Sequence, residues 1–417
     1  MENAILKHNP HWKKEYKNLY QRDILEDLLN KLHLKQIQVL KGIRRSGKTT
    51  LFKLIINKLL ENEESKSILY INLDDPYFSE LYSHSKNLYK LLELSEKLTG
   101  IKVQYLFLDE VQNVHAWEKF VKTIYDNELV KKIFITGSNS SLLDGEYATL
   151  LSGRFLSQTI TPPSYSEVLK YNDINSRFEL VDNKIQALKI CDSMMQFGSF
   201  FEVLNENKFK RDIVLSYYET IIFKDCIANN NLRDAKTFKE FVNFMISNST
   251  NMYSYNSLSK ATGINDNSVK EYIRVMQDCY LACEIKQYSY SLKEQIKTKK
   301  KIYINDNSFL AQTSFRFSKD LGKLLENFVY TELMKQNYEI YYFNKDFECD
   351  FICKKEEQII AIQVCYELTH QNKDREVNGL KKLKLKCDKK IIITYDNADE
   401  LENIDDIDIV NFWDYFS

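Results

Sequence analysis

The sequence predicts an α/β protein, and three features of the chain support that prediction. A short apolar run, Ile37–Leu40, leads into a turn bounded by glycines, and a helical pattern of apolar residues begins near Thr49. Two more apolar runs, Ser67–Asp75 and Val103–Leu108, lead into acidic residues, and the segment between them has helical character up to Leu98. Short apolar runs that alternate with helical segments indicate buried strands joined by helices.

The turn after the first apolar run fits the P-loop pattern G-x-x-x-x-G-K-[ST]. Glycines let the backbone curl so that its N–H groups converge on phosphate oxygens, and the helix N-terminus adds positive potential. Lys48 is expected to reach the β- and γ-phosphates of ATP, and Thr49 to hold Mg²⁺. The strand–loop–helix context argues against a chance match. The residues expected to bind the nucleotide are Gly42, Arg44, Arg45, Ser46, Gly47, Lys48, Thr49 and Thr50.

A pair of acids follows the apolar run Val103–Leu108. We expect Asp109 to bind Mg²⁺ together with Thr49, and Glu110 to act as the base that polarises the water attacking the γ-phosphate. A single acid at a strand end is commonly no more than a solvated terminus. The pair Asp109-Glu110 downstream of a P-loop is a more specific combination and favours ATP hydrolysis.

Two further positions are candidates for catalysis. The apolar run that begins at Lys132 ends in Ser138 and Asn139, and either side chain could orient the attacking water. Serine and asparagine are also common in ordinary turns. The place of this run in the order of strands favours the catalytic interpretation. Arg154 could stabilise charge on the transferred phosphoryl group, in its own subunit or in a neighbour. The alternative for Arg154 is an exposed ion pair with an acid, and the sequence does not decide between the two.

Length and composition limit the possible classes of protein. A chain of 417 residues is too long for one ordinary core. The content of 44% hydrophobic and 28% charged residues is typical of a globular protein. No apolar run is long enough to cross a membrane, and the first residues lack a signal-peptide pattern. We therefore expect a cytoplasmic protein without a membrane partner. The 58 basic and 59 acidic residues nearly balance, so any binding of nucleic acid must be local.

Residues 164–249 have apolar positions at helical spacing and predict a helical connector. Residues 257–279 then read as a helix, a glycine turn and a second helix, with Asn267 as the N-cap of the second. Residues 285–290 and 302–304 would form a two-stranded wing. This pattern resembles a winged helix. Such a fold would either place its second helix on DNA or serve only for packing and protein contacts, and the sequence leaves both alternatives open. The lysines expected on DNA phosphates are Lys293, Lys297, Lys299, Lys300 and Lys301, whereas the second helix carries Lys270, Glu271 and Arg274 and is not strongly basic.

Over nearly its whole length the chain resembles the family of bacterial and archaeal AAA-type ATP-binding proteins that join an ATPase domain to a C-terminal domain with a restriction-endonuclease-like core. The resemblance implies a doubly wound parallel sheet in which the catalytic-glutamate strand lies between the P-loop strand and its neighbours. The residues that carry it are Gly42–Thr50 with the pair Arg44-Arg45, Asn72–Asp75, Leu108–Gln112, Trp117-Glu118, Thr136–Ser138 and Gly153-Arg154.

The region after residue 302 resembles the PD-(D/E)XK nuclease core. Glu326 and Asp350 match metal-binding positions of that core, so with Gln363 they form a candidate second metal site. However, Gln363 stands where the second acid should be and Cys365 where the lysine should be, although Lys354 or Lys355 could substitute for that lysine. Cleavage of a phosphodiester needs charged carboxylates and a cation, so we expect a degenerate nuclease fold that has kept binding or scaffolding.

The sequence therefore predicts four regions: a P-loop ATPase domain over 1–163, a helical lid or connector over 164–249, a winged-helix-like domain over 250–301 and a nuclease-like domain over 302–417. The expected function is Mg²⁺-dependent ATP binding and hydrolysis by a molecular switch coupled to DNA, to a protein partner or to another copy of the chain. One alternative is an ATP-regulated DNA endonuclease. The other is a regulator that binds ATP without hydrolysing it.

Overall fold

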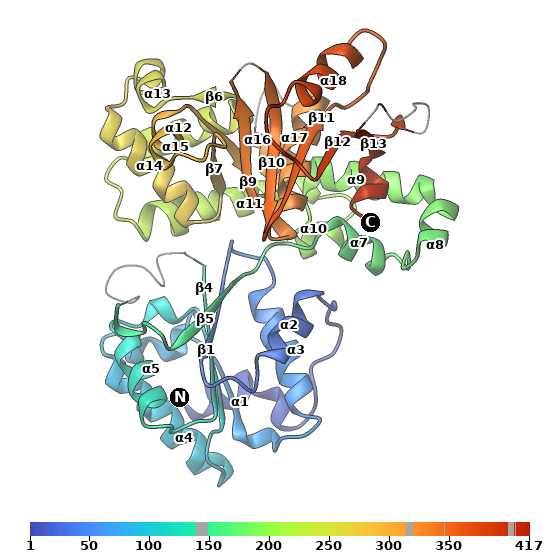
Figure 1. The fold of residues 1–417 in the computed structure, drawn as a ribbon. Helices are drawn as coiled ribbons and strands as arrows, with labels where there is room; N and C mark the ends of the chain where they lie inside the picture. The colour runs from blue at the N-terminus through green and yellow to red at the C-terminus, as the bar shows by residue number, and fades with distance from the viewer. Residues whose placement is uncertain (139–148, 314–319, 346, 399–403, 405) are drawn as a thin grey trace. The chain divides into compact units, whose positions relative to one another are not determined.

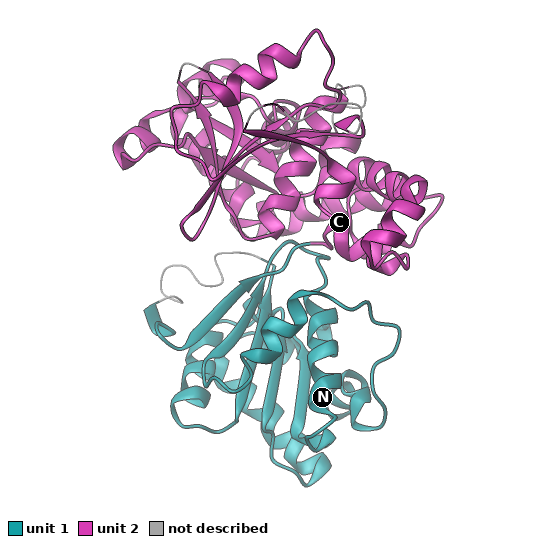
Figure 2. Ribbon diagram, turned by 45° about the vertical axis from the view of Figure 1, so that its right-hand side comes forward, with its two compact units in different colours: residues 1–161 teal, residues 162–417 magenta. Residues whose placement is uncertain are grey.

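The computed structural model of the protein describes residues 1–138, 149–313, 320–345, 347–398, 404 and 406–417. Figure 1 shows the order of its helices and strands. The chain forms two compact units, Met1–Thr161 and Pro162–Ser417 (Figure 2). The predicted division of the second half at residues 249 and 301 stays a prediction.

The first unit is built on a five-stranded parallel sheet with the order β2-β3-β4-β1-β5. Its strands are β1 (Ile37–Lys41), β2 (Ile68–Asn72), β3 (Tyr105–Asp109), β4 (Lys132–Gly137) and β5 (Phe155–Thr159). The order corrects one expectation, because β4 separates the Asp109 strand from the P-loop strand. Phe134 of β4 lies opposite both Gln38 of β1 and Phe107 of β3.

Helices cover both faces of this sheet, as a doubly wound fold requires (Figure 1). Successive strand residues point to opposite faces, so Val39 packs with the helices formed by Glu2–His8, Tyr89–Thr99 and Trp117–Asp126. Leu40 packs on the other face with the helices formed by Ile24–Asn30 and Lys48–Leu59. The predicted fold class of this unit is thus confirmed. The helices are α1 (Glu2–His8), α2 (Ile24–Asn30), α3 (Lys48–Leu59), α4 (Tyr89–Thr99) and α5 (Trp117–Asp126), with 3-10 turns η1 (Pro10–Trp12), η2 (Ser65–Ser67), η3 (Pro76–Leu81), η4 (Ser85–Leu88) and η5 (Val111–Asn113).

The second unit contains two sheets and a set of helices. A three-stranded antiparallel sheet has the order β6-β8-β7, and a five-stranded mixed sheet has the order β13-β12-β11-β10-β9. The strands are β6 (Met252–Tyr253), β7 (Ala282–Lys286), β8 (Lys300–Ile304), β9 (Glu339–Asn344), β10 (Glu348–Lys355), β11 (Gln358–Val364), β12 (Lys389–Thr394) and β13 (Ile407–Asn411).

The helices of the second unit include the long run predicted after residue 164. None of the described helices of the chain is long and apolar enough to cross a membrane. They are α7 (Tyr165–Tyr171), α8 (Arg177–Asp182), α9 (Lys184–Phe197), α10 (Phe201–Leu204), α11 (Lys210–Thr220), the π-helical segment η7 (Ile221–Ala228), α12 (Ala235–Ser247), α13 (Tyr255–Thr262), α14 (Asp266–Asp278), α15 (Leu292–Lys297), α16 (Asn307–Thr313), α17 (Leu321–Lys335), α18 (Lys373–Lys381) and α19 (Phe412–Tyr415).

The helix–turn–helix pattern is present, with one correction. α13 ends at Gly263, whose φ of +72° is the left-handed conformation that glycine adopts most easily. The N-cap of α14 is Asn265 and not Asn267, because the Asn265 side chain accepts a hydrogen bond from the Ser268 N–H. The predicted wing contains the helix α15 between β7 and β8.

The segment after α1 covers the exposed edge of the first sheet, where β2 would otherwise present unpaired backbone groups. Asn9 exchanges two hydrogen bonds with the backbone of Tyr70, and the indole of Trp12 donates to the Ile68 carbonyl at 2.8 Å. His11 Nε2 lies 3.0 Å from the same carbonyl, and its Nδ1 lies 3.1 Å from the Tyr16 hydroxyl. Burial lowers the pKa of His11 to about 4, so the ring is neutral and Nε2 carries the proton that it donates.

The neutral state of His11 predicts a pH dependence of stability. Its pKa is 6.5 in the unfolded chain and about 4 in the folded chain, so between these values the unfolded chain binds the extra proton. The free energy of unfolding therefore falls as pH falls through this window, by up to about 3 kcal/mol from this group. Urea unfolding at several pH values should show a shallower loss in His11→Gln than in the wild type. The exposed His33 provides the control, since His33→Gln should keep the wild-type slope.

Candidate functional site

The loop after β1 has the backbone conformation that its glycines make possible. Gly42 has a φ of +147°, and a Cβ atom there would lie 2.1 Å from the carbonyl oxygen of Ile160. Gly47 has a φ of +97° and precedes the first turn of α3. Any other residue at either position would be strained or would clash with backbone, so the loop depends on both glycines.

Inside the loop, polar groups are gathered at the start of α3. The buried Lys48 donates through Nζ to the carbonyl oxygens of Gly42 at 2.9 Å and Ile43 at 3.1 Å. The Ser46 hydroxyl is buried and has no hydrogen-bond partner among the described residues. Arg22 was not predicted as a site residue. It donates to the carbonyl oxygens of Ser46 at 3.2 Å and of Thr161 at 2.9 Å, so it links the P-loop to the segment after β5.

The Asp109 carboxylate is the centre of the site. Thr49 Oγ1 donates to it at 2.6 Å and the Tyr70 hydroxyl at 3.0 Å, and the Thr136 hydroxyl donates to its other oxygen. Burial raises the pKa of Asp109, and the neighbouring Glu110 raises it further, while these three hydrogen bonds act in the opposite direction. The structure thus brings together Thr49 and Asp109 as the sequence predicted. Tyr70 and Thr136 were not singled out, since nothing local marks a hydroxyl that points at an acid on another strand.

Glu110 lies directly after β3 in a left-handed conformation with a φ of +55°. Its backbone N–H donates to the Thr136 hydroxyl at 3.0 Å, and its carboxylate accepts a hydrogen bond of 2.5 Å from Gln112 Nε2. The other amide atom of Gln112, Oε1, is buried and has no partner among the described residues. Gln112 therefore fixes the orientation of the Glu110 carboxylate.

The oxygen atoms at this edge suit Mg²⁺, which prefers hydroxyl, carboxylate and phosphate oxygens. Thr49 Oγ1 and Asp109 Oδ2 are already 2.6 Å apart, so both can face one hard cation. The partnerless Ser46 hydroxyl and the inward Lys48 add a donor set that suits phosphate. The residues that are present therefore fit a Mg²⁺–nucleotide complex.

The remaining candidates of the first unit differ in their placement. Ser138 is buried at the end of β4, next to the Asp109 strand. Asn139 lies outside the described residues. Arg154 precedes β5 at the amino ends of the strands, roughly 15 Å of strand away from the P-loop edge. It makes a two-point ion pair with Asp126, as in the second of the two interpretations that the sequence left open, and its catalytic role stays a prediction.

In the second unit, the acids Glu326, Asp350 and the exposed Glu348 surround the buried Lys301. The Lys301 ammonium lies 3.0 Å from Glu348, 3.4 Å from Glu326 and 3.6 Å from Asp350. Burial acts to lower the pKa of Lys301, but the three carboxylates outweigh it and raise that pKa. Burial and Glu326 raise the pKa of Asp350 to about 8 despite the ammonium, because three carboxylates share one cation. Tyr303 completes the cluster by donating to Glu326 at 2.6 Å.

This cluster changes the interpretation of the candidate second metal site. Glu326 and Asp350 do lie close together, but Lys301 supplies the cation between them. Gln363 is not placed as a ligand, because its Oε1 accepts from the Asp350 N–H at 3.3 Å and its Nε2 donates to Glu376 at 2.9 Å. In the part of the chain that the structure describes, no three His, Cys, Asp or Glu side chains are grouped to hold a metal ion.

The lysines of the predicted winged helix differ in their exposure and in their partners. Lys300 and Lys301 are buried in β8, and Lys300 donates to the carbonyls of Ile296 and Thr298, so neither is available to a phosphate. Lys270 on α14 makes an ion pair with Asp266 one turn earlier. The exposed lysines that remain are Lys293, Lys297 and Lys299.

Together, the fold of the first unit and its site define an AAA-type P-loop domain. Residues 34–169 match the family described as AAA domain, residues 189–320 match the domain of unknown function DUF8612, and residues 321–415 match the domain of unknown function DUF4143. The chain belongs to the family of the uncharacterized protein MJ1544 of Methanocaldococcus jannaschii: the two are 33% identical in an alignment of 413 positions that covers 94% of this chain and 90% of that protein. An uncharacterized protein of Haemophilus influenzae is 27% identical in an alignment of 389 positions that covers 90% of this chain and 94% of that protein. The predicted relation to AAA-type proteins is confirmed, while the winged-helix and nuclease-like assignments stay predictions.

Solved structures show a weaker similarity. The ORC1 protein of Aeropyrum pernix in complex with DNA is 14% identical, covers 75% of this chain and 98% of its own, and has a TM-score of 0.32. AMPPCP-bound DnaA from Aquifex aeolicus is 17% identical, covers 64% of this chain and 90% of its own, and has a TM-score of 0.27. At such scores, nothing that either protein binds is assigned to this chain.

The charge cluster predicts a strong effect of removing Lys301. In Lys301→Met three carboxylates lose the ammonium that they share, and breaking a buried ion pair in this way should lower the free energy of unfolding by about 3 kcal/mol. Urea unfolding followed by circular dichroism measures this loss. The matched control is Lys299→Met, an exposed lysine two residues earlier, which should change stability by less than about 0.5 kcal/mol. Equal stability of the two variants would contradict the arrangement around Lys301.

Proposed function

We propose that this protein binds ATP with Mg²⁺ and hydrolyses it in the first unit. One observation carries the proposal: Thr49 at the start of the P-loop helix lies 2.6 Å from Asp109, and Glu110 follows directly at the same edge of the sheet. A P-loop, a metal-binding acid and an adjacent base are the parts that phosphoryl transfer to water requires.

Each residue then has a role that follows from its position. Backbone N–H groups of Gly42–Thr49 and the Lys48 ammonium would hold the phosphates, with Lys48 moving from its present carbonyl partners to the β- and γ-phosphate oxygens. Thr49 and Asp109 would hold Mg²⁺, which neutralises charge on the phosphates when bound. Glu110 would accept the proton of the attacking water.

Gln112 is proposed as a positioning residue for this reaction. A carboxylate that acts as a base must point at the water, and the bond from Gln112 Nε2 restricts where Glu110 can point. The Ser138 or Asn139 side chain is proposed to orient the same water.

We propose that the protein acts as a switch: the nucleotide bound in the first unit determines whether the second unit presents a binding surface to a partner. The support is that one chain joins the AAA domain to two further domains. A protein partner or another copy of the chain is favoured over DNA, because Lys300 and Lys301 are buried. DNA cleavage is not part of the proposal, since Lys301 supplies the cation between Glu326 and Asp350.

The assignment of the base predicts the behaviour of two variants. Glu110→Gln should bind ATP as the wild type does but turn it over at least about 100-fold more slowly, because the amide cannot accept the proton. Lys48→Ala should lose both binding and turnover. Phosphate release and equilibrium binding of a fluorescent ATP analogue measure the two properties separately.

The control for Glu110→Gln is Glu93→Gln, which makes the same chemical change at an exposed position of α4. Glu93→Gln should retain wild-type turnover. Wild-type turnover in Glu110→Gln as well would remove Glu110 from the mechanism, and no turnover in the wild type under multiple-turnover conditions would favour the non-hydrolysing regulator.

The positioning role of Gln112 predicts a change in kcat that is separate from any change in KM. Gln112→Ala should lower kcat by about tenfold with little change in KM, since one hydrogen bond to a charged group is lost and no contact with the nucleotide is proposed for it. Steady-state ATPase assays over a range of ATP concentrations measure kcat and KM separately.

The matched control is Gln104→Ala, at the opposite end of β3, which should leave both kcat and KM unchanged. A wild-type kcat in Gln112→Ala would remove Gln112 from the mechanism, and an equal fall of kcat in both variants would mean that the effect is not specific to the contact with Glu110.

A further inference from the structure

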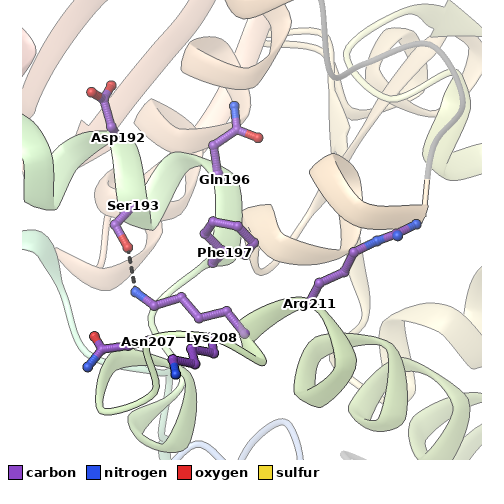
Figure 3. Close-up of a pocket in the computed structure, with 8 residues that line it drawn as sticks. Asp192, Ser193, Gln196, Phe197, Asn207, Lys208 and Arg211 are labelled. Atoms are coloured by element: carbon purple, nitrogen blue, oxygen red, sulfur yellow. Dashed lines mark hydrogen bonds between the residues drawn. The ribbon is translucent and has the colours of Figure 1, made fainter.

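The second unit contains an open pocket of about 370 Å³ between α9 and the loop that leads into α11. Figure 3 shows Ser193, Gln196 and Phe197 on the helix side and Asn207 and Lys208 on the loop side, with Arg211 at the start of α11. A volume of this size is at the lower end of small-molecule sites and is comparable to that of a mononucleotide.

Lys210 gives this pocket an unbalanced positive charge. Its side chain is partly buried, its ammonium donates to the neutral Ser193 hydroxyl at 2.9 Å, and it lies 5.8 Å from the centre of the Phe197 ring. No carboxylate lies within ion-pair distance of this ammonium among the described residues. A partly buried ammonium without an acidic partner is unfavourable by itself, and a bound anion would compensate it.

Two more cations border the same space, and the acids nearby have other partners. Lys208 and Arg211 are exposed residues of the pocket lining, and the Arg211 side chain extends away from Ser193 (Figure 3). Asp192 accepts a hydrogen bond of 2.6 Å from the Tyr395 hydroxyl. Glu206, which moderates the effect of burial on the pKa of Lys210, accepts from the N–H groups of its own loop, including that of Lys208 at 2.8 Å.

We propose that this pocket binds the phosphate group of a small phosphorylated ligand of up to mononucleotide size. Lys210 and Ser193 would contact the phosphate oxygens, Lys208 and Arg211 would add charge-assisted hydrogen bonds, and Phe197 would provide an apolar surface for the remainder of the ligand. The site is separate from the P-loop and does not depend on ATP hydrolysis there.

The test uses the full chain with Lys48→Ala, so that phosphate binding at the P-loop is removed. Isothermal titration calorimetry with inorganic phosphate and with AMP should show one site, with AMP binding more tightly. Adenosine, which lacks the phosphate, should bind at least about tenfold more weakly than AMP, and raising the salt concentration should weaken AMP binding.

Two further variants of that chain locate the site. Lys210→Met and the surface double variant Lys208→Ala/Arg211→Ala should each weaken AMP binding by about tenfold or more, whereas Lys236→Met, an exposed lysine of α12 outside the pocket, should not. The double variant changes only exposed side chains, so it remains informative if Lys210→Met fails to fold. Equal affinity for AMP in all three, equal affinity for adenosine and AMP, or no binding of phosphate or AMP would overturn the proposal.

Discussion

The first unit depends on the burial of one carboxylate, that of Asp109. A buried carboxylate is costly unless donors surround it, and here three hydroxyl groups do so from three different elements: Thr49 on α3, Tyr70 on β2 and Thr136 on β4. These elements meet only because the sheet has the order β2-β3-β4-β1-β5. The same hydrogen bonds that compensate the buried charge therefore hold the P-loop helix against the acids that complete the site.

The second unit also contains buried or partly buried charged side chains, and its two sites differ in how far those charges are compensated. Around Lys301, three acids share one ammonium, which lies where an external cation would otherwise sit between Glu326 and Asp350. Around Lys210 the balance is incomplete, because the ammonium contacts only a hydroxyl and an aromatic ring. The contrast suggests that the Lys301 cluster stabilises the fold, whereas the Lys210 pocket is arranged to receive an anion.

Much of the fold could be predicted from the sequence, and each error has a physical cause. The strands that end in Asp109 and in Gly137 and the long helix that carries Glu326 were predicted because their apolar patterns are local. The position of β4 between β3 and β1 was not, since sheet order depends on which strands pair and not on any one segment. The N-cap at Asn265 was missed by two residues because several polar residues there could have served.

The sequence by itself determined the parts of the site that lie within one short stretch. The P-loop is such a part, because its glycines, Lys48 and Thr49 act through the backbone that they share, and the adjacent acids Asp109 and Glu110 are another. Only the tertiary structure decided which other distant groups meet: Tyr70 and Thr136 with Asp109, Lys301 with the carboxylates of α17 and β10, and Arg154 with Asp126 away from the P-loop. The physical reason is that strand register and the sign of a neighbouring charge fix these contacts, and neither is contained in the local pattern of residues.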